Sequence, residues 1–276
     1  MAISRDFAYG IPKAELHLHL EGTLEPDLKL KLAKKNEIDI GQETVDEVEA
    51  SYQFDSLTSF LAVCYPAMNV LQDEDDFYAL GSAYFARAKE NGVVRAECFF
   101  DPQAHTSRGV ELEAVIRGYY RAVEEARENG LRVTMHCDID QVGSIDNIRT
   151  ALTKLGAERL DHGTNIIEDP ELAKLVVEKG IGLTSCPMSN SFVTEEMKGK
   201  EIVELLGRGV KVSINSDDPA YFGGYIADNF LTLAEKENLT KEQVAQLARN
   251  SIEISWAEES ERSAMLDSLE EFLAAH

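Results

Sequence analysis

Residues 13–23 read KAELHLHLEGT, and this stretch decides which fold and which chemistry the rest of the chain has to fit. Neighbouring side chains of a strand point to opposite faces, so His17 and His19 share one face and the intervening leucines occupy the other. Gly22 can end the strand just beyond them. Two imidazoles on one face form half of a metal site, because catalytic zinc sites typically keep three protein ligands and an open position. A pair of core histidines satisfied by hydrogen bonds is the alternative.

The hydrophobic pattern beyond this stretch predicts strands that alternate with helices. Such alternation indicates parallel β/α units, and we expect one domain, residues 1–276, folded as a (β/α) barrel of TIM type. Further strands are expected at 93–100, 132–137, 158–163, 181–186 and 211–215. Helices are expected at 25–36, 74–91, 111–129, 144–155, 170–179 and 201–208, from about 54, and from about 227 onward, and a surface connection at 38–49.

Four of the six expected strands end in residues that can bind a metal. The carboxyl ends of barrel strands meet at one face, which is where active sites of such barrels lie. Three ends that carry histidines and one that carries two aspartates are hard to explain as core packing, so they favour a metal centre. The residues are His17, His19, His136, His162, Asp217 and Asp218.

The composition narrows the class of partner. The chain of 276 residues carries a formal net charge of −23, which argues against the basic surface that binding of nucleic-acid polymers needs. The same charge disfavours association with anionic membranes. A small neutral substrate is compatible with it.

The four cysteines are scattered, without the CxxC spacing of a zinc–thiolate motif. A disulfide framework is not expected in a chain of this size. The first residues lack the long apolar segment of a secretory signal, and no apolar run approaches the length of a transmembrane helix. We therefore expect a cytoplasmic protein.

Five segments together resemble the adenosine/adenine deaminase family of the metal-dependent amidohydrolase superfamily, and the last looks more like the bacterial adenine deaminase group than the adenosine-acting one. The resemblance covers most of the chain. The segments are PKAELHLHLEGTL at 12–24, AECFFDPQAHTSRG at 96–109, ERLDHGTN at 158–165, LTSCPMSN at 183–190 and VKVSINSDDPAYFGGY at 210–225.

The resemblance implies one Zn²⁺ per chain and a role for each strand-end residue. His162 matches the histidine that orients and deprotonates the attacking water, and Asp218 matches the carboxylate that hydrogen-bonds a purine ring nitrogen. Gly163 lets the chain approach closely behind His162. Ser189 could contact the substrate or serve only as a turn residue. The implied metal ligands are His17, His19, His136 and Asp217.

The chain departs from the family pattern at the third histidine. The family usually has His-Ala-Gly-Glu there, and the Glu donates a proton to N1 of the purine. This chain has Ile139 at the Glu position. Asp138 or Asp140 could supply the acid instead, or both could be loop carboxylates that cap the following helix.

The middle of the chain departs from the family as well. Between Phe100 and Arg132 there is room for one helix, where the family fits two more strands with their helices. About six strands instead of eight imply a truncated or incomplete barrel. The backbone groups on its exposed strand edges must then be hydrated, bridged by the 111–129 helix, or paired with another chain. Self-association is therefore one expectation, and a homo-oligomer would result.

The resemblance implies hydrolytic deamination of adenine or an N6-substituted adenine to a 6-oxopurine and ammonia or an amine. The partner would be a small-molecule purine. One alternative is a catalytically impaired purine- or metal-binding relative, which the missing Glu and the missing strands favour. Another is an amidohydrolase that acts on a non-purine amide or amidine, with Asp218 used for a different purpose.

Overall fold

The computed structural model describes residues 3–124, 134–137, 144–150, 152–153, 157–194 and 196–276. The predicted α/β fold is confirmed. The described strands are β1 (Lys13–Glu15), β2 (Val93–Ala96), β3 (Thr134–Cys137), β4 (Arg159–His162), β5 (Gly182–Ser185) and β6 (Lys211–Ile214).

Helices follow or separate these strands, as the β/α pattern predicts. In the first half they are α1 (Arg5–Gly10), α2 (Pro26–Lys35), α3 (Val45–Ala50), α4 (Leu57–Ala67), α5 (Glu74–Glu90), α6 (Pro102–Thr106) and α7 (Leu112–Glu124). In the second half they are α8 (Ser144–Thr150), α9 (Pro170–Lys179), α10 (Pro187–Val193), α11 (Gly199–Gly207), α12 (Pro219–Phe222), α13 (Ile226–Glu237), α14 (Lys241–Glu253) and α15 (Glu259–Ala275). Short 3₁₀ turns lie at Leu20–Thr23, Met68–Val70 and Thr164–Glu168.

All pairings between the described strands are parallel. β3, β4, β5 and β6 form one sheet in that order, and β1 pairs with β2. Isolated bridges continue the ladder beyond β1, from Leu18 to Asp217 and from His19 to Phe99. The six strands therefore follow one another in the order β2-β1-β6-β5-β4-β3, which is an open arc. No pairing between β2 and β3 closes a barrel within the described part of the chain.

Some element bounds differ from the prediction for local reasons. The strand expected at 93–100 ends at Ala96, which pairs with the last residue of β1, Glu15, and beyond it only an isolated bridge from Phe99 to His19 continues the ladder. Helix α3 forms inside the expected surface connection. Its start carries a capping box, in which Thr44 and Glu47 each accept a hydrogen bond from the backbone N–H of the other. Helix α1 was not predicted.

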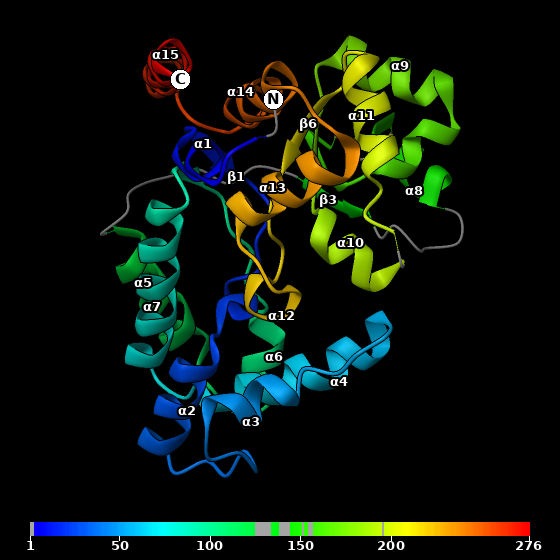
Figure 1. The fold of residues 1–276 in the computed structure, drawn as a ribbon. Coiled ribbons are helices and arrows are strands. Elements are labelled where there is room, and N and C mark those ends of the chain that lie inside the picture. The colour runs from blue at the N-terminus through cyan, green and yellow to red at the C-terminus, as the bar shows by residue number, and fades with distance from the viewer. Residues whose placement is uncertain (1–2, 125–133, 138–143, 151, 154–156, 195) are drawn as a thin grey trace.

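Two hydrophobic clusters hold the molecule together. One surrounds β4, β5 and β6 and takes in buried side chains of α9, α11, α13 and α14. The other joins α2, α4, α5, α7 and α12. In Figure 1 α2, α4, α5 and α7 lie below and to the left of the strands, whereas α9 and α11 lie above and to their right. The carboxyl ends of the strands therefore open between the two clusters.

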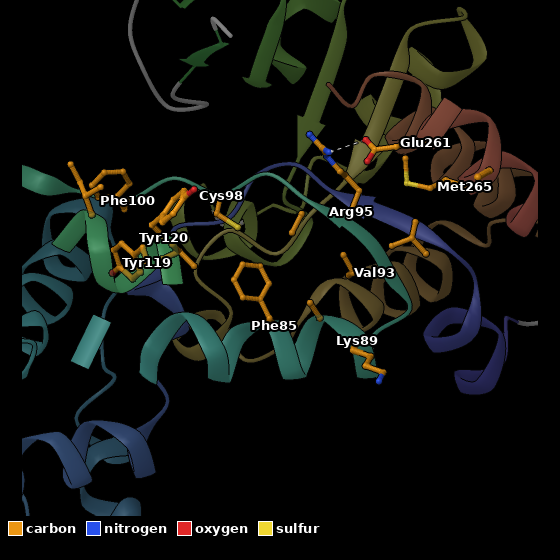
Figure 2. A pocket seen from close by; sticks show the side chains of 16 residues that line it. Phe85, Lys89, Val93, Arg95, Cys98, Phe100, Tyr119, Tyr120, Glu261 and Met265 are labelled. Atoms are coloured by element: carbon orange, nitrogen blue, oxygen red, sulfur yellow. Dashed lines mark ion pairs between the residues drawn. The ribbon is translucent and has the colours of Figure 1, made fainter. Parts of the chain in front are cut away.

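A groove of about 790 Å³ lies along β2 at the open end of the arc. Figure 2 shows Phe85 of α5, Cys98, Phe100 and Tyr119 of α7 on its lining. Its far wall comes from α15, where Glu261 faces Arg95 with 3.8 Å between Oε2 and Nη1. The edge that two further strands cover in a complete barrel is thus lined by apolar side chains here.

None of the described helices combines the length and apolar character that crossing a bilayer requires.

Candidate metal centre and purine pocket

The ends of β1 and β6 bring three predicted ligands together. The backbone N–H of Asp217 donates to the carbonyl of His17 (3.1 Å), and the N–H of His19 donates to the carbonyl of Asp217 (3.1 Å). Oδ1 of Asp217 lies 3.5 Å from Nε2 of His17 and 3.6 Å from Nε2 of His19. One ligand atom from each of the three residues lies within 4.8 Å of the others.

These separations fit a metal ion. Four ligand atoms placed tetrahedrally at zinc distances of 2.0–2.1 Å are about 3.3 Å apart, close to the spacing of the three side chains. Imidazole nitrogen and carboxylate oxygen are also donors that zinc accepts. The backbone of Asp217 has φ of 64°, a left-handed conformation that is uncommon for non-glycine residues and that clusters at functional sites.

Hydrogen bonds behind His17 select which of its nitrogens faces the cluster. Thr184 Oγ1 donates to Oδ1 of Asp161 (2.8 Å) and so accepts from Nδ1–H of His17 (3.0 Å). With the proton on Nδ1, Nε2 keeps its lone pair toward Asp217 and the metal position. Such a partner behind a histidine ligand fixes its orientation and raises its basicity.

His162 ends β4 beside the cluster. Its Nε2 lies 3.8 Å from Oδ2 of Asp217, and its ring centroid lies 4.5 Å from that of His17. The left-handed backbone continues from His162 (φ 59°) into Gly163 (φ 73°). A Cβ at Gly163 would meet the Leu160 and Leu183 side chains at 3.2 and 3.3 Å, so this turn packs closely on the core.

The two aspartates after β6 have opposite electrostatic surroundings. Burial favours protonation of Asp217, but the charges and hydrogen bond of His17, with His162 and His19, lower its pKa well below the usual range. Burial raises the pKa of Asp218 well above the usual range, and the charges of Asp217 and Glu21 add to that rise. The surroundings of Asp217 therefore favour its charged form, which suits a cation, and those of Asp218 favour its protonated form.

A cavity of about 170 Å³ adjoins the cluster. Ser189 lies on its wall, where its hydroxyl donates to Oδ2 of Asp217 (2.6 Å) and holds that carboxylate. The remaining wall is largely apolar and comes from α4 and α12. The lining residues include His19, Glu21, Phe60, Leu61, Cys64, Tyr65, Met68, Asp101, His162, Asp217, Asp218 and Phe222.

For three predicted site residues the structure describes no side chain. The backbone of His136 belongs to β3 and pairs in register with Asp161 of β4, and two strands, β4 and β5, separate it from β6 in the arc. Its side chain lies outside the described part of the structure. Asp138 and Asp140 lie outside the described residues altogether.

The structure also brings to the site residues that the sequence pattern did not predict. Thr184 and Asp161 belong to β5 and β4, and their role depends on pairing that a linear sequence does not display. Glu21 sits within the first motif but was read only as part of it. His105 lies in the matched segment 96–109 and is fully buried against Glu21.

Comparison with known proteins now decides the family. The sequence profile described as Adenosine deaminase matches residues 12–126 and 114–272. The chain belongs to the adenosine deaminase family. An adenine deaminase of Hahella chejuensis is 36% identical over 99% of this chain and 100% of that protein. An uncharacterized deaminase of Schizosaccharomyces pombe is 39% identical over 98% of each chain.

Solved structures of the family have the same fold. The crystal structure of an adenine deaminase from Arthrobacter aurescens matches with a TM-score of 0.89 and 33% identity, over 96% of this chain and 100% of that chain. A Burkholderia ambifaria amidohydrolase with bound zinc matches with a TM-score of 0.80 over 100% and 97% of the two chains. At 21% identity this second likeness shows the fold alone.

The alignments also locate the shortening relative to the deaminase family. The alignment with the S. pombe relative runs over 332 positions, more than the 276 residues of this chain. The family profile matches in two pieces that meet in residues 114–126. The described part of this junction, residues 114–124, belongs to α7, between β2 and β3, where no pairing joins the described strands.

Proposed function

We propose that this chain hydrolytically deaminates adenine or an N6-substituted adenine, giving a 6-oxopurine and ammonia or an amine. The observation that carries the proposal is the His17–His19–Asp217 cluster, which adjoins a cavity bounded by Asp218. The adenine deaminases among the relatives support the choice of substrate, since they match nearly the whole chain.

We propose one zinc ion per chain, held by His17, His19, His136 and Asp217. The donor set and its spacing support zinc, and the Burkholderia amidohydrolase contains it. When bound, such an ion supplies Lewis-acid activation of water at neutral pH.

The chain's own residues would divide the remaining work. His162 stands beside Asp217 and takes the proton from the water that attacks C6 of the purine. Asp218 hydrogen-bonds a ring nitrogen and thereby fixes the ring in the pocket, while Gly163 and Ser189 shape the walls behind the reacting atoms. Asp138 or Asp140 protonates N1, so that negative charge does not build up on the ring during attack.

A catalytically impaired purine- or metal-binding relative is the second candidate. The open arc between β2 and β3 favours it, because an incomplete barrel can hold ligands without holding the reacting groups at working distances. Ammonia release from a panel of 6-aminopurines separates the two. Turnover of adenine or an N6-substituted adenine is expected, and binding without turnover would establish the second candidate.

We also propose that residues 1–276 act as one domain and self-associate along the open edge. Among the described strands β2 pairs only with β1, and Val94, Phe100, Ile116 and Tyr120 expose apolar surface along its groove. A second copy of the chain would cover that surface. A cytoplasmic location is proposed from the cysteines, since Cys64, Cys98 and Cys186 are free thiols.

A further inference from the structure

Glu21 is a buried carboxylate whose two oxygens differ in their hydrogen bonding. Its side chain is 1% exposed. Oε1 accepts three hydrogen bonds, from Nε2–H of His105 (2.8 Å), the hydroxyl of Tyr119 (3.1 Å) and the backbone N–H of Asp101 (3.2 Å). Oε2 is buried and has no hydrogen-bond partner in the described part of the structure.

The donors fix Glu21 in one orientation. Arg108 Nη2 lies 2.9 Å from Nδ1 of His105, and a guanidinium can only donate, so Nδ1 accepts and the ring proton sits on Nε2. His105 is itself fully buried. This chain of donors keeps Oε1 turned toward His105 and Tyr119, which leaves Oε2 as the acceptor available to a ligand.

Glu21 and Asp218 share one side of the purine cavity. Both residues line it, and Gly22 brings the two chain segments into contact, since a Cβ at Gly22 would lie 1.9 Å from Oδ1 of Asp218. A flat ring held by Asp218 therefore has Glu21 near its edge. The cavity of about 170 Å³ is smaller than the roughly 300–1,000 Å³ of pockets that enclose drug-sized ligands, which favours a bare ring system.

We propose that Oε2 of Glu21 accepts a hydrogen bond from the N–H of the imidazole ring of a free purine base, and that this bond makes the site select bases over N9-substituted purines. A free base carries one N–H on its imidazole ring, whereas a purine with a sugar or methyl group on N9 has none. A buried acceptor left unpaired penalises the ligand that lacks the donor. The inference rests on the proposed function and adds the residue that selects its substrate class.

The test compares hypoxanthine with 9-methylhypoxanthine by calorimetric titration of the zinc-loaded full chain. The wild type should bind the free base about 10- to 100-fold more tightly, the range expected when a hydrogen bond to a charged group is lost. In Glu21→Gln the three donors hold the amide oxygen, so the amide NH₂ faces the ring and cannot accept. That variant should therefore bind hypoxanthine more weakly and keep its affinity for 9-methylhypoxanthine, so that the preference disappears.

Glu25→Gln is the matched control. Glu25 accepts from the Tyr225 hydroxyl (2.8 Å) and does not line the cavity, so its replacement should leave the preference unchanged. Equal affinity of the wild type for the two ligands, or an equal loss of both in Glu21→Gln, would overturn the inference. Equal affinity of the wild type for the two ligands would overturn the inference even if Glu21→Gln does not fold.

The outcomes also separate this inference from the proposed function. Selective binding of the free base without ammonia release from any 6-aminopurine would refute deamination and leave the role of Glu21 standing. Deamination of 9-methyladenine as fast as adenine would refute the role of Glu21 and leave the proposed deamination standing.

Discussion

At the scale of single residues, Thr184 decides which nitrogen of His17 faces the metal position, because its hydroxyl donates to Asp161 and therefore accepts from Nδ1–H of His17. We expect Thr184→Val to weaken metal binding by about 10- to 100-fold, the usual cost of removing such a supporting partner. Competition with a chromophoric chelator measures the affinity.

Thr184→Ser is the control for this prediction, since serine keeps the hydroxyl and should retain most of the affinity. A valine variant that binds metal as tightly as the wild type would mean that the packing around His17, and not this hydrogen bond, sets its orientation.

His162 tests the division of labour around Asp217. Its Nε2 is 3.8 Å from Oδ2, whereas His17 and His19 approach Oδ1. If His162 handles the proton of the attacking water, His162→Ala should lower kcat by roughly 100- to 10,000-fold and leave the metal content of the purified protein unchanged. Loss of the metal together with activity would identify His162 as a ligand.

At the scale of elements, α7 must lie close against α5 to deliver Tyr119 to Glu21. Figure 1 shows the two helices side by side. A Cβ at Gly118 of α7 would lie 2.5 Å from the Glu74 carbonyl oxygen and 2.5 Å from Cβ of Phe77, both on α5. Glycine at this position therefore allows the contact between the helices.

We expect Gly118→Ala to lower the free energy of unfolding by about 1–3 kcal/mol, the usual cost of overpacking. Urea denaturation measures it, and Gly207→Ala serves as the control, because no atom lies within 4 Å of the added Cβ there. Equal stability of Gly118→Ala and the wild type would show that α5 and α7 separate without cost.

The sequence predicted the elements whose pattern is local and missed what depends on contacts across the fold. Helix α9 was predicted to the residue, since Pro170 at its first turn and Gly180 after its last residue are encoded in the chain itself. The positions of His17, His19 and Asp217 at strand ends were likewise predicted, and the structure brings the three side chains together.

Other features could not be read from the chain alone. The support of Thr184 for His17 joins residues 167 positions apart, and Tyr119 meets Glu21 across 98 positions. The end of β2 coincides with the end of its partner β1, since Ala96 pairs with Glu15, and no periodicity reveals this pairing. The open Oε2 of Glu21 follows only from counting donors in three dimensions.

At the scale of the whole molecule, the open arc and the net charge of −23 act against each other. The apolar groove along β2 favours association with a second copy of the chain, whereas the negative charges of the two copies repel each other. Salt at 0.5 M screens charges beyond a few ångströms and leaves apolar burial intact. We therefore expect dimers whose dissociation constant falls as salt is raised, measured by analytical ultracentrifugation at two ionic strengths.

Val94→Lys is the matching variant, because a lysine on an exposed strand edge opposes pairing with another chain. Val94 is 44% exposed and lines the groove. The variant should sediment as a monomer at both salt concentrations. A wild type that stays monomeric at high protein and high salt would contradict association along this edge.

The most direct measurement is ammonia release from adenine as zinc is returned to the metal-free chain. The account predicts that the rate rises with added zinc, reaches a plateau at about one ion per chain, and stays at least 100-fold lower throughout in His162→Ala. That variant keeps the ligands, so the comparison excludes a contaminating deaminase. A wild-type rate that does not depend on zinc, or that equals the His162→Ala rate, would contradict metal-dependent deamination by this chain.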